Sequence, residues 1–208
     1  MRNAIRHLSA VDPAMQALIR RVGRCGYAQE RREPYEALVR AIAHQQLHGA
    51  AARTILGRFV ALYPEQAFPT PEQVLSTSDE ALRRCGFSGS KAASIRDIAL
   101  RALEGVVPTR RAAARLSNAD LIERLTVIRG VGRWTVEMLL MFNLGRVDIL
   151  PVDDFGVREG YRKLHGLDDQ PKPKELAAIG EMWSPWRSVA SWYLWRAAEE
   201  GRAQTQQA

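Results

Sequence analysis

The sequence contains a pair of adjacent carboxylates that could take part in a chemical reaction. Asp153 and Asp154 follow a Pro-Val step and precede Phe155, at the predicted start of a helix. A carboxylate there ordinarily caps the helix by accepting backbone N–H groups. It can also stabilise positive charge that develops during a reaction, or orient a water molecule. The acid pair alone leaves both interpretations open.

A glycine-containing turn, Arg129-Gly130-Val131-Gly132, lies shortly before the acids and separates two predicted helices. Glycine allows a positive φ and lets another backbone approach closely. Successive backbone N–H groups, together with the positive end of the next helix, can bind an anion such as a DNA phosphate. A Gly-x-Gly turn by itself is more typical of a plain corner between two helices.

The elements that must position these residues are predicted to be helices. Apolar residues recur at helical spacing, and Thr77, Ser90 and Ser117 are predicted N-caps. Ser184-Pro185 is predicted to open the last helix as its cap and first residue. The predicted ranges include 13–22, 35–46, 50–62, 91–103, 133–142, 153–164 and 186–199. Neither strand alternation nor a hairpin dipeptide is found, so an all-α fold with short loops is expected.

Composition favours a polyanionic partner. The 208 residues carry a formal net charge of +7, and nucleic acid is the first candidate for such a chain. The two cysteines, Cys25 and Cys85, are too few for a four-thiolate iron–sulfur cluster. The sequence has no apolar run long enough for a membrane span and no secretory h-region, so a cytoplasmic location is expected.

Four ordered blocks of the sequence resemble the helix-hairpin-helix/GPD superfamily of DNA glycosylases. They are 38–49, the hairpin around Gly130, Pro151-Val-Asp-Asp-Phe155 and Trp183-Ser-Pro-Trp-Arg-Ser188. Within the superfamily, the chain is most similar to the DNA-3-methyladenine glycosylase II family, in a compact form without an N-terminal β-domain. The resemblance covers about Tyr35 to Trp195.

The resemblance implies two helical subdomains with an active-site cleft between them. The expected division is an N-terminal segment 1–35 that packs with the C-terminal subdomain, a subdomain 36–148 that contains the hairpin at about 121–142, and a subdomain 149–208 that carries the catalytic acid. The implied function is base excision repair, in which alkylated purines such as 3-methyladenine and 7-methylguanine are flipped out of DNA and excised.

The resemblance also assigns roles to residues near the acids. Asp154, immediately before the aromatic residue, takes the position of the catalytic carboxylate, and Asp153 is expected to cap the helix and support it. Tryptophan faces attract cationic bases, although tryptophans equally pack in helical cores. The residues expected to line the base pocket are Trp134, Trp195, Met138 and Phe155.

A further set of residues is expected to contact DNA. Gln45, Gln46, Leu47 and His48 match the segment that enters the minor groove and fills the gap left by the flipped base; capping of helix contacts is the alternative for the glutamines. Phosphate donors are expected at Gly130, Gly132 and Arg133, and the family often holds a monovalent cation at carbonyls that correspond to Ile128 and Gly130. The segment Ser88-Gly-Ser-Lys91 suggests either a second phosphate site or simple capping.

The residue at position 134 predicts how the sugar is attacked. Bifunctional relatives have a lysine there that forms a Schiff base. Here it is tryptophan, and the lysines lie elsewhere, at 91, 163, 172 and 174. Hydrolysis by water, without lyase activity and without a cofactor, is therefore expected.

The expected partner of this monomeric, nucleoid-associated enzyme is double-stranded DNA that contains alkylated bases. The alternatives are a non-catalytic helix-hairpin-helix module, a lyase or mismatch enzyme of the same fold, and an all-α scaffold that does not bind DNA.

Overall fold

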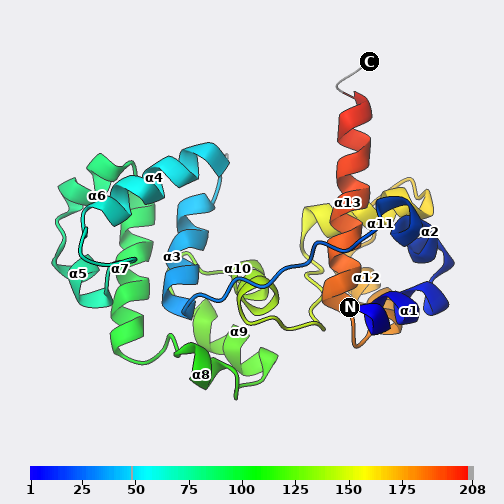
Figure 1. Cartoon of the computed structure of the whole chain (residues 1–208), viewed down its shortest axis with the longest axis horizontal. Helices are drawn as coiled ribbons and strands as arrows, with labels where there is room; N and C mark the ends of the chain where they lie inside the picture. The colour runs from blue at the N-terminus through cyan, green and yellow to red at the C-terminus, as the bar shows by residue number, and fades with distance from the viewer. Residues whose placement is uncertain (48, 206–208) are drawn as a thin grey trace. The chain divides into compact units, whose positions relative to one another are not determined.

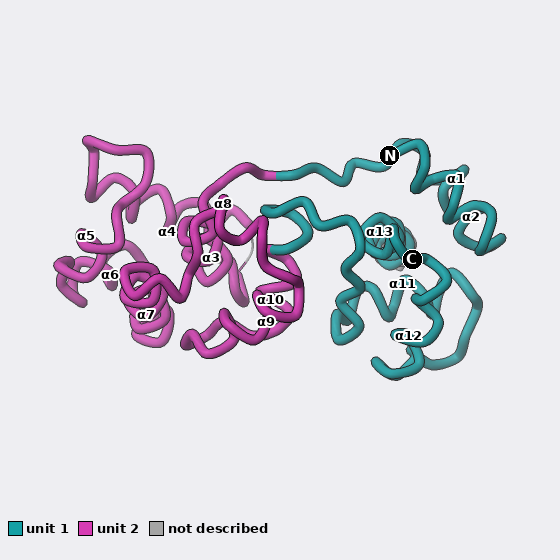
Figure 2. Tube along the Cα trace, turned by 90° about the horizontal axis from the view of Figure 1, so that it is seen from below, with its two compact units in different colours: residues 1–29, 140–208 teal, residues 30–139 magenta. Residues whose placement is uncertain are grey.

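A computed structural model gives the fold of residues 1–47 and 49–205, with side chains up to residue 200. Over these residues the backbone forms helices, turns and loops and no β-strand, so the all-α prediction is confirmed (Figure 1). The helices form two compact units, distinguished by colour in Figure 2. Unit 1 contains residues 1–29 and 140–208, and unit 2 contains residues 30–139.

Unit 2 is one continuous stretch of chain. It carries the helix before the predicted minor-groove segment and both helices of the hairpin. Its helices are α3 (Pro34–His44), α4 (Gly49–Ala61), α5 (Pro71–Ser76), α6 (Asp79–Cys85), α7 (Gly89–Leu103), α8 (Arg110–Ala113), α9 (Asn118–Thr126) and α10 (Arg133–Met138).

Unit 1 is assembled from both ends of the chain. The N-terminal part supplies α1 (Arg2–Val11) and α2 (Pro13–Val22). The C-terminal part begins with a π-helical turn, η1 (Leu139–Asn143), whose first residue still belongs to unit 2. It continues with α11 (Phe155–His165), α12 (Pro173–Gly180), a 3₁₀ turn η2 (Glu181–Trp183) and α13 (Arg187–Thr205). The unit boundaries thus lie at 29/30 and 139/140, where 35/36 and 148/149 were expected from sequence.

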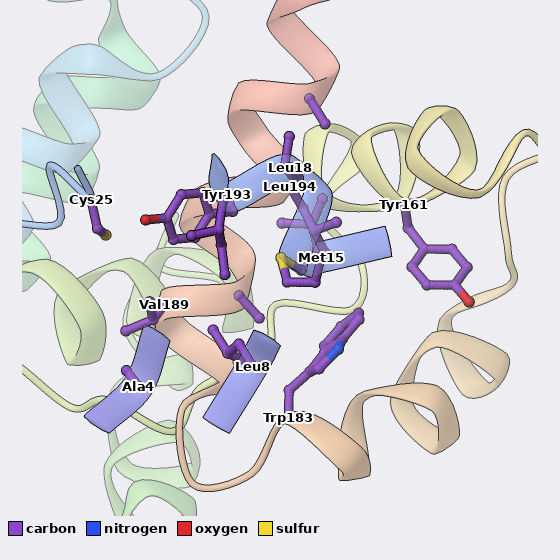
Figure 3. Packing of buried hydrophobic residues seen from close by; sticks show 14 of the residues in the cluster. Ala4, Leu8, Met15, Leu18, Cys25, Tyr161, Trp183, Val189, Tyr193 and Leu194 are labelled. Carbon is purple, nitrogen blue, oxygen red and sulfur yellow. The ribbon is translucent and has the colours of Figure 1, made fainter. Parts of the chain in front are cut away.

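The core of unit 1 joins its two chain segments. Ala4, Leu8, Met15 and Leu18 from the N-terminal helices are completely buried in one cluster with Trp183, Tyr193 and Leu194 (Figure 3). The Trp183 indole N–H also donates to the Asp12 carboxylate at 3.1 Å. Because each large apolar side chain contributes roughly 1.5–3 kcal/mol when fully buried, this cluster ties the first 20 or so residues to the C-terminal helices.

Several predicted caps are displaced by one or more residues. Helix α6 is capped by Ser78, because Thr77 ends α5 and donates to the Gln73 carbonyl. Helix α7 is capped by Ser88 instead of Ser90, which supports capping for the 88–91 segment. The predicted cap at Ser184 is wrong, because that residue follows the turn η2 and α13 begins only at Arg187.

The described helices do not include one long and apolar enough to cross a membrane.

Candidate active site

Asp154 occupies the N-cap position of α11. Its Oδ1 accepts a hydrogen bond from the Val157 backbone N–H at 2.8 Å. The expectation that Asp153 is the capping residue is therefore wrong, and that side chain lies exposed one residue earlier. An aspartate at this position is fixed by the cap and stabilised by the positive end of the helix. The fold thus presents one oriented, half-buried carboxylate at the start of α11.

Trp195 of α13 provides a second donor to the same oxygen. Its Nε1 donates to Asp154 Oδ1 at 2.8 Å. The indole also lies beside the Phe142 ring, with centroids 5.8 Å apart. Phe155, by contrast, is 60% exposed. Within unit 1 the structure therefore joins the predicted catalytic acid directly to one of the predicted pocket tryptophans.

Two glycines of α11 allow this contact. A Cβ at Gly156 would lie 2.8 Å from the Trp195 ring, and a Cβ at Gly160 would overlap the backbone carbonyl of Leu194. Glycine at these positions, one helical turn apart, lets α13 pack directly against the backbone of α11. The approach of the two helices sets the distance between the carboxylate and the indole.

The loop that leads to Asp154 is held by the start of α13. The Ser188 hydroxyl, which is fully buried, donates to the Arg146 carbonyl at 2.8 Å and accepts from the Ile149 N–H at 3.0 Å. The Ser188 N–H donates to the Val147 carbonyl at 2.9 Å. One serine therefore satisfies three backbone groups of a segment that has no regular structure of its own.

Asp148 and Arg187 form a second tie between this loop and α13. The guanidinium donates through Nε to Oδ1 at 2.7 Å and through Nη2 to Oδ2 at 2.9 Å, and Ser184 Oγ donates to Oδ2 at 3.0 Å. Burial would raise the pKa of Asp148, but the hydrogen bonds from Arg187 and Ser184 outweigh burial and lower it below its usual value.

Asp148→Asn is expected to lower the free energy of unfolding by about 1–3 kcal/mol at pH 7, because it removes a charge-assisted bidentate pair. A carboxyl whose pKa is lowered by folding stabilises the protein above its unfolded pKa, about 3.9, and loses that contribution as pH falls through the folded value. Urea unfolding at pH 7 measures the loss of unfolding free energy, and urea unfolding below pH 4 measures how that loss depends on pH. A difference between wild type and variant that stays constant down to pH 3 would contradict the assignment.

The hairpin of unit 2 connects α9 to α10. Ile128 and Val131 are buried, and the Val131 N–H donates to the Ile128 carbonyl at 3.0 Å. Gly130 has φ +77°, and a Cβ there would lie 2.5 Å from Ser94 Oγ, so only glycine fits. The N-cap of α10 is Gly132, where no side chain of the described residues caps the helix. The backbone N–H groups at this end of α10 can therefore donate hydrogen bonds to an anion.

Arg133 contributes to the hairpin in a different way from its neighbours. Its guanidinium is paired with the buried Glu137 at 2.9 Å, which leaves its backbone amide as the predicted phosphate donor.

The predicted cation ligands are the carbonyls of Ile128 and Gly130. Each accepts one hydrogen bond, from Val131 N–H and from Gln45 Nε2 respectively. A carbonyl oxygen has two lone pairs, so these oxygens fit the donor chemistry of a monovalent cation. Residues 1–47 and 49–205 hold no cluster of three His, Cys, Asp or Glu side chains that could bind a metal.

The predicted minor-groove segment follows α3. Gln45 Nε2 donates to the Gly130 carbonyl at 3.0 Å, so this side chain connects the segment to the hairpin. Gln46 is exposed and has φ +56°, an unusual value for a residue with a side chain. Leu47 is 39% exposed, and His48 lies outside the described residues.

A cavity of about 600 Å³ brings these elements of unit 2 together, a volume typical of small-molecule sites. Two of the four predicted base-pocket residues and two of the four predicted minor-groove residues line the same cavity. Its lining consists of Ala41, His44, Gln45, Gln46, Ser88, Ser90, Lys91, Trp134, Thr135 and Met138. Trp134 is 45% exposed, which leaves its ring accessible for stacking.

Two titratable groups in the cavity were not predicted from sequence. Burial, together with the nearby charges of Arg40, Arg53 and Lys91, lowers the pKa of His44. Lys91 Nζ donates to the Ala43 carbonyl at 2.9 Å and to the Gln45 carbonyl at 2.6 Å, and burial lowers its pKa. A lysine in the first turn of an amphipathic helix gives no sequence signal for such contacts, since most lysines there are solvated.

Comparison with known proteins identifies the family that this chain resembles. Residues 39–185 match the model of the HhH-GPD superfamily of base excision DNA repair proteins. The chain is 46% identical over 195 residues to DNA-3-methyladenine glycosylase 1 of Schizosaccharomyces pombe, a match that covers 93% of this chain and 86% of the relative.

Solved structures are also similar over nearly the whole chain, two of them from Schizosaccharomyces pombe and Bacillus halodurans. One is the S. pombe 3-methyladenine DNA glycosylase Mag1 in complex with abasic DNA, with 45% identity, a TM-score of 0.84 and coverage of 93% and 95% of the two chains. The other is a DNA-3-methyladenine glycosidase of Bacillus halodurans, with 34% identity, a TM-score of 0.85 and coverage of 97% and 91%.

Proposed function

This chain belongs to the HhH-GPD superfamily of base excision DNA repair proteins and is a DNA glycosylase, and we propose that it excises alkylated purines with water as the nucleophile. The relatives named for 3-methyladenine support this substrate class. Each unit supplies a different part of the reaction. Unit 2 binds the DNA backbone and extrudes the damaged nucleotide, and unit 1 supplies the carboxylate that acts on the sugar.

The observation that carries the proposal is the fixed carboxylate of Asp154. Alkylation on a purine ring nitrogen places positive charge on the base and weakens its bond to the sugar. As the base leaves, positive charge develops on the sugar. A preorganised carboxylate stabilises this charge without reorganisation and can orient the attacking water. The hydrogen bonds from Val157 N–H and Trp195 Nε1, both 2.8 Å, supply the preorganisation.

Tryptophan faces supply the recognition of a cationic base. Trp134 is exposed beside Met138 in the cavity of unit 2, and Trp195 contacts the catalytic carboxylate in unit 1. A cation over an indole face gains about 0.5–2 kcal/mol. Stacking of this kind depends on the charge and shape of the base and on few hydrogen bonds. The proposed selectivity therefore covers several alkylated purines.

Backbone amides of Gly130, Gly132 and Arg133 are proposed to bind a DNA phosphate, and a monovalent cation, when bound at the Ile128 and Gly130 carbonyls, would add positive charge there. Gln46 is proposed to fill the space left by the flipped base. Extrusion costs a few kcal/mol and costs least at a damaged pair, which contributes to selectivity. The exposure of Gln46 next to the hairpin contact of Gln45 supports this role.

Water is the proposed nucleophile because no lysine occupies the position of Trp134. The single lysine of unit 2, Lys91, is engaged with two backbone carbonyls. Without an amine that forms a Schiff base, the product is an uncut abasic site.

Incubation of the purified protein with dimethyl sulfate-treated duplex DNA tests the proposal. We expect chromatography to detect released 3-methyladenine and 7-methylguanine, and hot alkali to cleave the resulting abasic sites. Borohydride added during the reaction should trap no covalent adduct. Absence of methylated base release would overturn the substrate assignment, and a trapped adduct would overturn the role of water.

A further inference from the structure

Lys91 has contacts to which the mechanism above assigns no positioning role. Its ammonium group donates to the carbonyls of Ala43 and Gln45, at the C-terminal end of α3 and just beyond it. The last carbonyls of a helix have no partner within the helix, and cations stabilise that end. The contacts span 46 to 48 positions of sequence, so they join α7 to the segment that carries Gln46.

The conformation of Gln46 requires such contacts. A left-handed backbone conformation is unfavourable for a residue with a side chain, and it persists where the surroundings determine it. The flanking hydrogen bonds are Lys91 to the Gln45 carbonyl, Gln45 Nε2 to the Gly130 carbonyl at 3.0 Å, and the Leu47 N–H to the His44 carbonyl at 3.2 Å. These bonds hold the backbone on both sides of Gln46.

The same face of α7 also holds the hairpin. Lys91, Ser94 and Asp97 are three residues apart and so lie along one side of the helix. Ser94 lies against Gly130, and the Asp97 carboxylate accepts the Arg129 N–H at 2.7 Å. Helix α7 is thus one rigid element that fixes both the phosphate-binding turn and the Gln46 turn.

We propose that Lys91 is a positioning residue for base extrusion. It holds residues 45–47 in the conformation from which Gln46 enters the duplex, and Gln45 relates this turn to the hairpin. The inference rests on the proposed function, in which Gln46 replaces the flipped base. It separates two steps: DNA backbone binding depends on the hairpin, whereas extrusion depends on Lys91.

Lys91→Met removes the ammonium group and keeps the aliphatic stem. Lys163→Met is the matched control, because Lys163 is also half-buried, also donates to a carbonyl, that of Ala198 at 2.7 Å, and carries the same charge. Single-turnover excision is measured on duplexes with the alkylated base either paired or opposite a mismatch. Salt-dependent binding to undamaged duplex is measured in parallel.

We expect K91M to excise the paired lesion about tenfold more slowly than wild type. The mismatched lesion, whose extrusion costs less, should be excised within about threefold of wild type. Binding to undamaged DNA should equal that of K163M, and Lys91→Arg, which keeps the donors, should restore most of the rate.

The inference would be overturned if K91M lost the same fraction of its excision rate on paired and mismatched lesions, or if K163M lost as much rate as K91M. If K91M does not fold, the same comparison between K91R and Lys91→Gln decides it, with the paired-lesion defect expected only in K91Q. Wild type that releases no alkylated base contradicts the proposed function instead. Wild type that is active, with Gln46→Ala slowed on the paired lesion and K91M unaffected, contradicts this inference alone.

Discussion

Asp154→Asn is expected to lower the single-turnover rate constant for alkylpurine excision by about 100- to 1,000-fold at pH 7, with little change in binding to undamaged duplex DNA. The amide keeps an oxygen that can accept from Val157 N–H and Trp195 Nε1, and asparagine caps helices as well as aspartate does. The substitution therefore removes the negative charge and leaves the local structure intact.

Asp153→Asn is the matched control for this measurement. It makes the same change of charge one residue earlier, at an exposed side chain that does not cap α11. We expect its rate constant to remain within about threefold of wild type, since a solvated charge is screened. Equal losses in the two variants, or normal excision by D154N, would show that the carboxylate does not stabilise the sugar.

Gly160→Ala is expected to lower the free energy of unfolding by about 3 kcal/mol. Alanine is ordinarily the better helix former, so the direction is opposite to that expected from helix propensity. The reason is the overlap of a Cβ with the Leu194 carbonyl, which forces α11 and α13 apart. Because these helices carry Asp154 and Trp195, the excision rate should fall as well.

Gly57→Ala in α4 is the control for this second prediction. A Cβ at Gly57 meets no atom within 4 Å, and the residue is exposed within the helix. The free energy of unfolding of this variant should rise by about 0.5–1 kcal/mol, because alanine loses less backbone entropy on folding. Urea unfolding followed by circular dichroism compares the two. A G160A protein as stable as wild type would mean that the helices do not approach as closely as the structure indicates.

Helices and the hairpin could be predicted from the sequence because their signals are local. Apolar periodicity reflects one buried face, and glycines at 130 and 132 reflect a sharp turn. Three errors in the predicted caps concern which of two nearby polar residues caps a helix. Ser88 and Ser90, Thr77 and Ser78, and Asp153 and Asp154 are similar in type, and the choice between them depends on where the previous segment ends.

The rest of the site could not be predicted because it depends on contacts between residues far apart in sequence. Lys91 reaches carbonyls at the end of α3, and Arg187 pairs with Asp148 across 39 positions. The positive φ of Gln46 has no signature in a glutamine. The roles expected for the site residues come from the resemblance to a family and stay predictions, and the structure adds which neighbours hold these residues.

The assembly of unit 1 from both ends of the chain determines the order in which the protein can fold during translation. Residues 30–139 leave the ribosome as one uninterrupted segment, so unit 2 can fold while the remainder is being made. The apolar sides of α1 and α2, with Leu8 and Leu18, have no core to enter until α11 and α13 are synthesised. Helices α1 and α2 therefore reach their buried positions only after the C-terminal helices of unit 1 have been made.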